Sequence, residues 1–453
     1  MKHHLPFLDG WKGLAIIWIM VGHIVPFYAW DTGSDVRSAL YCATQLIFLS
    51  VDIFFIISGF LTAAPLVRGE KFEITRFLRN RAARLLPLYF AVIIIVLALP
   101  RFNMILTKSY TVYHTYRVTK VALPQARFEI EDTAGEKAVM DVEASGGRVK
   151  YKITGKKATE RGELTFPPGE FPFRKILPGF SFNVSDSSSM DVKLPSRNPD
   201  EKVIPYFLLL ENYVPHAKRV EMLGQMWFVS VLVHFWIIYA IVVHFVRRYS
   251  AGPNVRRNLS ILFGLLIVAV NLLKWRFSGS YDGYYYHQFT HMRIDAIFFG
   301  CMLAMLLPVS NPKYVAGMSP LIFRLMSLTG LLAAAGICVY LWKTPLPNLE
   351  VVPPFLFTAG YMAFGLMILG SYRTWRPAIF FLENPLLRLI GRYSYGIFLV
   401  HYPLIYIYSL SKSRFHPGNI ISIAVYLLLS ILAGMSLELF GNAVRARLSK
   451  QNA

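Results

Sequence analysis

The chain has 453 residues, of which 55% are hydrophobic and only 16% are charged. Since about a quarter of the residues of an ordinary soluble domain are charged, this composition excludes a soluble enzyme, a disordered chain and a coiled coil. The formal net charge is +21. Such an excess suits either nucleic acid binding or basic cytoplasmic loops, and its concentration in short connectors between apolar runs favours the loops.

Apolar stretches recur from one end of the chain to the other, so we predict an all-α polytopic membrane protein. The three cysteines lie in apolar segments without metal-ligand spacing, and we therefore expect neither a disulfide framework nor a metal site. About ten transmembrane helices are expected, at Trp11–Trp30, Leu46–Leu66, Leu86–Leu106, Met226–Phe245, Leu259–Leu273, Ile294–Leu307, Leu321–Leu341, Pro354–Leu369, Tyr395–Leu410 and Ile420–Phe440.

The basic residues predict the orientation, because cytoplasmic connectors are enriched in Lys and Arg. The connectors on the opposite side, such as Asp31–Ser38, are nearly free of base. Both termini are therefore expected in the cytoplasm. With that orientation the clusters on the cytoplasmic side are Arg68–Arg84, Arg247–Arg257, Arg373–Arg392 and Arg445–Lys450.

A polar stretch at 107–205 separates the helices of residues 1–106, the first three, from those of residues 206–453, the fourth to the tenth. Alternating or β-rich segments within it predict a small extracytoplasmic β-rich insert. The segments expected to form strands are Thr111–Thr119, Arg127–Glu131, Arg148–Thr154 and Gly179–Val184.

Ionisable residues at membrane depth are costly, so each one is a candidate for function. The first span contains Lys12 and His23, which are eleven residues apart. They therefore share a helix face about 16 Å apart along the axis. A neutral imidazole at this depth can accept a proton from a hydroxyl group. The alternative is a histidine that is hydrogen-bonded between helices, with Lys12 extending to the interface.

The next candidates are Asp52 in the second span and the pair Arg81 and Arg84 before the third. Asp52 has either a direct catalytic role or a buried salt bridge to a base on another span. The two arginines are three residues apart on a helix, an arrangement that suits phosphate groups. Their alternative role is to set the topology.

Further polar and aromatic residues mark the later spans. Arg293 and Asp295 are two residues apart, so they do not face each other, and their ion-pair partners are expected on other helices. Ser394 and His401 are seven apart and share a face. Trp227 and Tyr395 suit an interfacial belt, and Glu438 is a buried acid that is expected to be paired.

Several of these segments together resemble the membrane acyltransferase 3 family. Its opening Arg-x10-His is similar to Lys12 with His23, and its Arg-x-x-Arg motif to Arg81–Pro87 followed by Tyr89. The resemblance covers about 350 residues, in the correct order. The other matching segments are Val51–Leu61, which contains Ser58, Leu208–Tyr213, Trp227–Phe235, Arg293–Gly300 and Gly391–Pro403, with a closing Glu438. Two positions differ from the family pattern: Lys12 replaces an Arg, and Ser230-Val231-Leu232 replaces Ser-Val-Glu.

The resemblance implies an integral membrane O-acyltransferase. It would move an acyl group, commonly acetyl, from cytoplasmic acyl-CoA to a hydroxyl of an envelope or cell-surface carbohydrate. The acyl-CoA is a donor substrate, and no permanently bound cofactor is expected. His23 takes the place of the family's essential histidine, as general base or transient acyl carrier, and Asp52 is the second catalytic candidate. Lys12, Arg81 and Arg84 take the places of its basic residues, for which we expect contact with the CoA phosphates. The candidates for structural or substrate-positioning roles are Ser58, Trp227, Arg293, Asp295, Ser394, Tyr395, His401 and Glu438.

The expected location is a bacterial inner membrane, with the lipid bilayer and a carbohydrate or glycolipid as partners and no nucleic acid. Two alternatives remain at this point. One is a transporter or flippase that uses buried His23, Asp52 and Asp295. The other is a receptor or scaffold whose membrane charges only hold the helices together.

Overall fold

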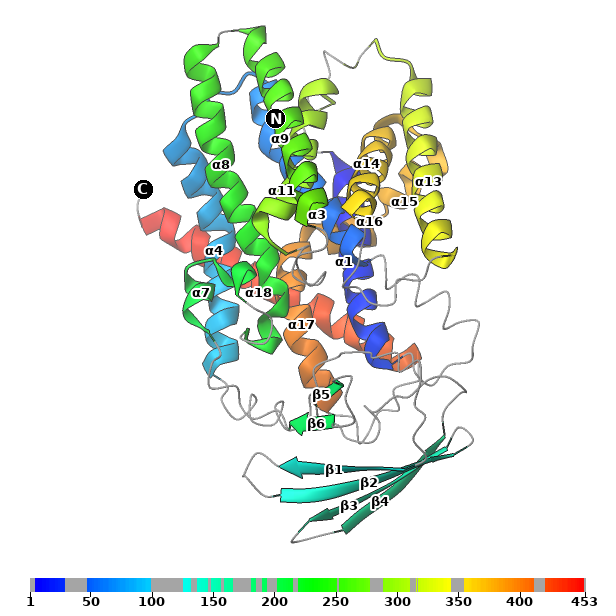
Figure 1. The fold of residues 1–453 in the computed structure, drawn as a ribbon. Coiled ribbons are helices and arrows are strands. Elements are labelled where there is room, and N and C mark those ends of the chain that lie inside the picture. Colours follow the sequence, from blue (N-terminus) through cyan, green and yellow to red (C-terminus); the bar gives the residue numbers. More distant parts are fainter. Residues whose placement is uncertain are drawn as a thin grey trace. The chain divides into compact units, whose positions relative to one another are not determined.

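The structure is a computed structural model in which the chain divides into two compact units, one formed by Met1–Val96 with Lys202–Ala453 and the other by Leu97–Glu201. Figure 1 shows the elements of both units, which are described separately below. The residues that the structure describes are 5–28, 47–98, 202–214, 219–250, 252–277, 288–309, 315, 317–343, 354–410 and 420–451, together with six strands between 125 and 193.

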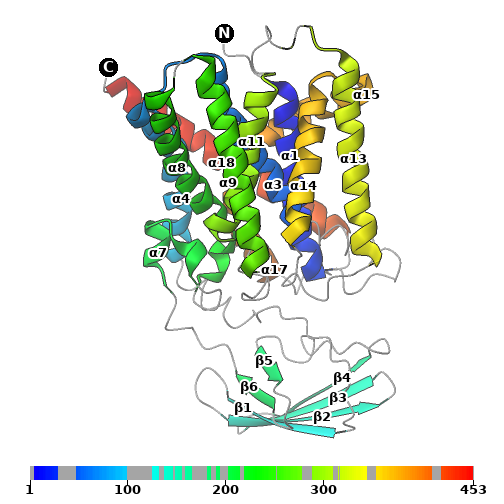
Figure 2. The same cartoon turned by 45° about the horizontal axis from the view of Figure 1, so that its top comes forward.

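The first unit is helical throughout its described residues, which confirms the predicted multi-helix membrane architecture. Eight of the described helices are long and apolar enough to cross a membrane, so the predicted number of ten spans stays a prediction. The long helices are α1 (Pro6–Tyr28), α3 (Ile47–Val67), α4 (Ile74–Ala98), α8 (Trp227–Tyr249), α9 (Pro253–Phe277), α11 (Thr290–Leu306), α13 (Pro320–Lys343), α14 (Pro354–Gly370), α17 (Ser394–Leu410) and α18 (Ile420–Gln451). Figure 2 shows most of them running side by side.

The outer helices expose apolar side chains. Leu265 of α9 and Leu332 of α13 are 62% and 63% exposed, and Ile94 of α4 is 56% exposed. A protein in water rarely presents such a continuous apolar exterior. The exterior therefore fits a lipid environment, as the composition predicts.

The centre of the unit is the contact between α3 and α11, which two glycines bring unusually close. A Cβ atom added at Gly59 would lie 2.0 Å from the backbone oxygen of Ile297, and one added at Gly300 would lie 2.1 Å from that of Ile56. Small residues allow this kind of backbone approach between membrane helices. The Cys301 thiol also donates to the Gly59 oxygen across the same contact, at 3.3 Å.

Short elements connect and brace the long helices. α7 (Ile204–Phe207), η2 (Glu211–Tyr213) and η4 (Glu221–Met226) precede α8, and η6 (Ser371–Arg373), α15 (Arg376–Leu382) and α16 (Pro385–Arg392) precede α17. Asn384 caps α16, because its side-chain oxygen accepts hydrogen bonds from the backbone N–H groups of Leu386 and Leu387. α16 packs against α1, and η4 packs against α17.

The second unit contains one six-stranded sheet with the order β4-β3-β2-β1-β6-β5. Neighbouring strands are antiparallel except β1 and β6, which are parallel. The predicted strand at Thr111–Thr119 lies outside the described residues, and β2, β4 and β6 are strands that the sequence reading did not mark. The strands are β1 (Gln125–Glu131), β2 (Lys137–Ser145), β3 (Arg148–Gly155), β4 (Thr159–Thr165), β5 (Ser181–Val184) and β6 (Met190–Lys193).

Two predicted helix limits are wrong in a way that affects the site. The third span was expected to begin at Leu86, but α4 begins at Ile74, so the helix that carries Arg81 and Arg84 is continuous with that span. The fifth was expected to end at Leu273, but α9 continues to Phe277 and includes Lys274. In both cases a charged residue ended the apolar run in the sequence, whereas the backbone hydrogen bonds continue through it.

Candidate active site

His23 of α1 lies against His401 of α17. The Nε2 atom of His401 is 3.2 Å from the Nδ1 atom of His23, and the ring centroids are 5.2 Å apart. The His401 side chain is fully buried, and the His23 ring packs edge-on against Tyr402, with centroids also 5.2 Å apart. The structure therefore brings together two predicted site residues that are 378 positions apart in the chain.

The hydrogen bonds of this pair determine which nitrogens carry protons. The Nδ1 atom of His401 is 2.7 Å from the backbone oxygen of Phe398, which can only accept, so Nδ1 carries the hydrogen. In a neutral His401 ring, Nε2 is then the acceptor. His23 must donate to it from Nδ1, and the Nε2 atom of neutral His23 is left as a bare acceptor nitrogen.

Neighbouring elements hold the part of α17 that carries His401. The side-chain amide of Gln225 in η4 donates to the backbone oxygen of Leu399, at 2.9 Å. Tyr402 lies directly over Gly224, where an added Cβ atom would be 3.1 Å from its ring. The Tyr426 hydroxyl of α18 donates to the His401 backbone oxygen at 3.2 Å. The His23–His401 geometry is therefore braced from two sides.

Two of the predicted donor-binding residues gather with Glu438 of α18. Lys12 and Arg84 both attract the Glu438 carboxylate electrostatically, as does Arg445. Lys12 also forms an ion pair with Asp9, at 2.6 Å. Tyr395, which donates to the Leu85 backbone oxygen at 2.8 Å, belongs to the same group, because Glu438 and Arg84 both act on its hydroxyl. Residues from α1, α4, α17 and α18 thus form one basic cluster.

Arg81 is half-buried beside this cluster, with Arg84 as its charged neighbour. Its guanidinium lies over the rings of Phe77 and Trp236, at 5.6 and 5.8 Å from their centroids. Arg84 is exposed. The two arginines therefore present one stacked and one accessible guanidinium at the same end of α4.

Asp52 forms a buried ion pair with Arg293. The Arg293 Nη2 atom is 2.6 Å from the Asp52 Oδ1 atom, and both side chains are at most 1% exposed. Asp52 precedes Gly59 by seven residues, and Arg293 precedes Gly300 by seven. Since seven residues are about two helical turns, the glycines that bring α3 and α11 together also align the charges.

A second buried ion pair lies next to the first. Lys274 of α9 bonds Asp295 at 2.5 Å, with both side chains at most 1% exposed. Asn271 lies 3.4 Å from the same carboxylate and 3.2 Å from the Tyr361 hydroxyl. The expected partners of Arg293 and Asp295 are thus found on other helices, as Asp52 and Lys274. The sequence reading missed Lys274 because its predicted span ended one residue earlier.

The Asp52–Arg293 ion pair is linked to the histidine pair through aromatic rings. The Arg293 guanidinium lies 5.6 Å from the Phe55 ring, which stacks on Phe228 at 4.9 Å. Phe228 contacts Phe398, whose ring lies 5.5 Å from His401. Within the described residues no ion pair or hydrogen bond joins Asp52 to His23.

The remaining predicted residues lie in packing positions. Trp227 packs edge-on against Phe55, with centroids 6.2 Å apart. Ser394 is buried at the start of α17, and Ser58 is half-buried on α3.

Glu211 is a buried acid that the sequence reading missed. It accepts hydrogen bonds from the Ser230 hydroxyl at 2.6 and 2.7 Å, and the Tyr89 hydroxyl lies 3.4 Å away. Burial raises the pKa of the Glu211 carboxyl from 4.5 to about 7, although Ser230 and the charge of Arg219 lower it. The sequence did contain a signal for Glu211, because the Glu of the family's Ser-Val-Glu pattern is absent after Ser230-Val231. In the structure Ser230 contacts a carboxyl group that comes from outside its own helix.

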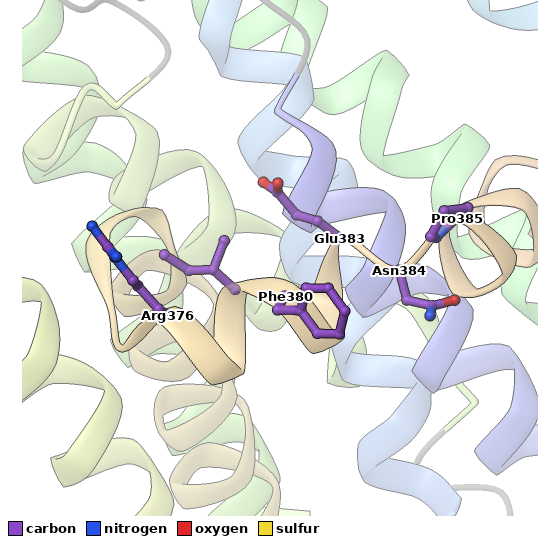
Figure 3. Close-up of a pocket in the computed structure, with 6 residues that line it drawn as sticks. Arg376, Phe380, Glu383, Asn384 and Pro385 are labelled. Carbon is purple, nitrogen blue, oxygen red and sulfur yellow. The ribbon is translucent and has the colours of Figure 1, made fainter.

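A separate surface pocket lies on α15 and α16 (Figure 3). Its lining includes two oppositely charged residues, Arg376 and Glu383. Its helices pack on the start of α1, since an added Cβ atom at Gly10 would lie 1.9 Å from the Leu382 backbone oxygen. None of the predicted site residues lines it. The lining residues are Arg376, Ile379, Phe380, Glu383, Asn384 and Pro385.

Comparison with known proteins gives one family match and several relatives. The family model described as an acyltransferase domain, acyltransferase 3, matches residues 5–123 and 195–439. The O-acetyltransferases OatA of Staphylococcus aureus strains NCTC 8325 / PS 47, COL and MRSA252 are each 33% identical over 98 residues, which are 21% of this chain. The matched stretch is only 14% of the length of each relative. No solved structure matches.

The family match spans both helical segments and leaves out most of the insert. It contains both histidines, both buried ion pairs and Lys12, Arg84 and Glu438 of the basic cluster. The chain therefore belongs to the acyltransferase 3 family, and its multi-helix membrane unit is an acyltransferase domain.

Proposed function

We propose that this protein transfers an acyl group from cytoplasmic acyl-CoA to a hydroxyl of an extracytoplasmic carbohydrate. Acetyl is the proposed group, because the relatives it matches are named O-acetyltransferases. The observation that carries the proposal is the hydrogen-bonded pair of His23 and His401, which leaves the Nε2 atom of His23 as a proton acceptor.

The proposed reaction balances with this single base. His23 Nε2 accepts the proton of the acceptor hydroxyl as the hydroxyl oxygen attacks the thioester carbonyl carbon. The carbon–sulfur bond then breaks, and the thiolate takes the proton from His23, which restores the ring. The same nitrogen could instead attack the thioester first and carry the acyl group to the hydroxyl. Both routes need His23 neutral and correctly oriented.

The donor is proposed to bind at Lys12 and Arg84 of the basic cluster and at Arg81 beside it. Phosphate groups would replace the Glu438 carboxylate as the anion there, since guanidinium and ammonium groups bind phosphate strongly. Lys12 and His23 lie about 16 Å apart along α1. A donor whose phosphates bind at Lys12 must therefore extend its acyl arm along α1 to reach His23.

Asp52 is proposed to support the site rather than to react. Its carboxylate is neutralised by Arg293 within the α3–α11 contact, an arrangement that favours the structural alternative over direct catalysis. Asp295 is likewise neutralised by Lys274. Two carboxylates with buried cationic partners give no support to solute binding by a transporter.

The insert at 107–205 is proposed to bind or orient the acceptor, with a spacer or stabilising cap as the alternative. The test is to delete it and measure the apparent affinity for the glycan. An unchanged affinity would rule out a binding role.

The function is tested with purified protein in lipid vesicles, labelled acetyl-CoA and a panel of glycans, assayed on both sides of the membrane. The proposal expects label on a glycan placed opposite the acetyl-CoA, with one free CoA per acyl group transferred. Movement of a glycan across the membrane without CoA release would instead identify a flippase.

A further inference from the structure

Three aromatic rings lie together beside the start of α11, and we call them the ring platform: Tyr213 of η2, Phe289 and His291. Their interplanar angles are 9°, 8° and 13°, and their centroids are 5.4, 5.8 and 5.5 Å apart. In a column of three stacked rings the outer centroids would be about 9 Å apart or more. The three rings are therefore nearly parallel neighbours in a triangle.

The ring platform is open to the outside of the protein. Tyr213 is 43% exposed, His291 is exposed and Phe289 is half-buried. The Tyr213 hydroxyl and the His291 Nδ1 atom are hydrogen-bonded at 3.2 Å, which keeps the two rings in one orientation. The platform thus combines accessible ring surface with polar ring edges.

Buried polar groups form hydrogen bonds with the residues next to the three rings in the chain. The Arg219 guanidinium donates to the backbone oxygens of Val214 and Asn212, at 2.6 and 3.1 Å, and to the Gln288 side chain. The Asn212 amide donates to the Thr290 hydroxyl at 2.9 Å. Arg219 is 6% exposed and Asn212 is fully buried. Inward polar residues therefore alternate with outward rings, and the platform is fixed before any ligand arrives.

The element that follows the Tyr213 segment, η4, packs beside the histidine pair. The Tyr206 hydroxyl accepts a hydrogen bond from the Val220 backbone N–H at 3.1 Å, which ties α7 to the start of η4. Gly224 of η4 lies under Tyr402, and the Tyr402 ring lies 5.2 Å from that of His23. Tyr213 and Gly224, which packs on Tyr402 beside His23, are thus only eleven residues apart in the chain and belong to the same unit.

We propose that the ring platform binds a pyranose ring of the acceptor carbohydrate, an inference that rests on the proposed function. The negative faces of aromatic rings attract the weakly positive C–H groups on one face of a sugar. The polar edges of Tyr213 and His291 suit its hydroxyl groups. The platform lies on the side where α11 begins, which the predicted orientation places outside the cytoplasm.

The test compares Phe289→Ala and His291→Ala with wild type in vesicles, using the panel glycan that wild type acylates best. Each variant is expected to raise the acceptor KM by about 2- to 10-fold, the loss of one aromatic contact, with little change in kcat or in the donor KM. Tyr213→Phe keeps the ring and removes only its hydroxyl, so its acceptor KM should rise less than that of Tyr213→Ala. Tyr249→Ala is the matched control, because Tyr249 is 78% exposed at the far end of α8.

Direct binding separates this proposal from the proposed function. Intrinsic fluorescence titration with chito- and malto-oligosaccharides, without any acyl donor, should show binding by wild type that Phe289→Ala weakens. Binding without acyl transfer would support the platform and contradict the proposed acyl transfer to a carbohydrate. No binding by wild type, or equal acceptor KM and equal binding in folded variants, would overturn the platform and leave the rings as a membrane-interface belt.

Discussion

His401 fixes the tautomer of His23. Its Nδ1 hydrogen is committed to the Phe398 backbone oxygen at 2.7 Å, and its Nε2 atom therefore accepts from His23 Nδ1 at 3.2 Å. The nitrogen of His23 that remains bare is the one on the far side of the ring. His401 is thus a positioning residue for the proposed base.

The first prediction concerns His401. His401→Phe keeps a ring but removes the acceptor, so kcat should fall by about 10²-fold or more, within the range that proton transfer contributes. His401→Gln retains a side-chain oxygen and should recover part of that loss. Acyl-transfer kinetics should show unchanged donor KM in both variants. Equal kcat for the Phe and Gln variants would argue that His401 only fills space.

The second prediction concerns the contact between α3 and α11. Gly59→Ala should lower the free energy of unfolding by about 1–3 kcal/mol, because the new methyl group would lie 2.0 Å from the Ile297 backbone oxygen. Gly264→Ala on α9 is the control, since an added Cβ atom there has nothing within 4 Å. Thermal unfolding in one detergent measures both variants. A Gly59→Ala midpoint equal to that of Gly264→Ala would contradict the close approach.

The third prediction concerns the buried pair of Asp52 and Arg293. Arg293→Met should cost about 3–5 kcal/mol of stability, because it leaves an uncompensated buried carboxylate. The double variant Asp52→Leu with Arg293→Met should recover most of this loss. Glu70→Gln is the control, because the Arg68–Glu70 pair is exposed and such pairs contribute little. Additive losses in the double variant would show that the two residues are not coupled.

The fourth prediction concerns pH. Burial raises the pKa of Glu211 from 4.5 to about 7, and the groups that face it are Ser230, Tyr89 and Arg219. Between these two values the folded state keeps a proton on Glu211 that the unfolded state has lost. The contribution of Glu211 to the free energy of unfolding is therefore fully present below pH 4.5 and declines as the pH rises to 7. Unfolding midpoints across this range should decline less in Glu211→Gln than in wild type. A slope in Glu211→Gln equal to that of wild type would refute the raised pKa of Glu211.

Much of the helical layout is predictable because hydrophobic length alone determines where a chain can cross a bilayer. The partners in the buried ion pairs are harder to predict. Sequence spacing shows that Arg293 and Asp295 do not face each other, but Asp52 is 241 residues away from Arg293, and only the α3–α11 contact brings them together. Sequence reasoning predicts that a partner exists and leaves its identity open.

The residues that were missed have a common physical cause. Lys274 follows directly on a predicted span, and Glu211 lies between the predicted insert and the fourth span, where polar residues are ordinary. Each is buried only because other helices pack over it, and a local window of sequence does not contain that information. His401 was predicted as a positioning residue, but its bond to His23 depends on two helices at opposite ends of the chain.

The central claim is most directly tested by acyl transfer in His23→Gln. Labelled acetyl-CoA and the best acceptor glycan are incubated with wild type, with His23→Gln and with His244→Gln, which alters an exposed histidine of α8. The account predicts a loss of at least about 10²-fold in His23→Gln and wild-type transfer in His244→Gln. Equal transfer by wild type and His23→Gln would remove the histidine from the mechanism.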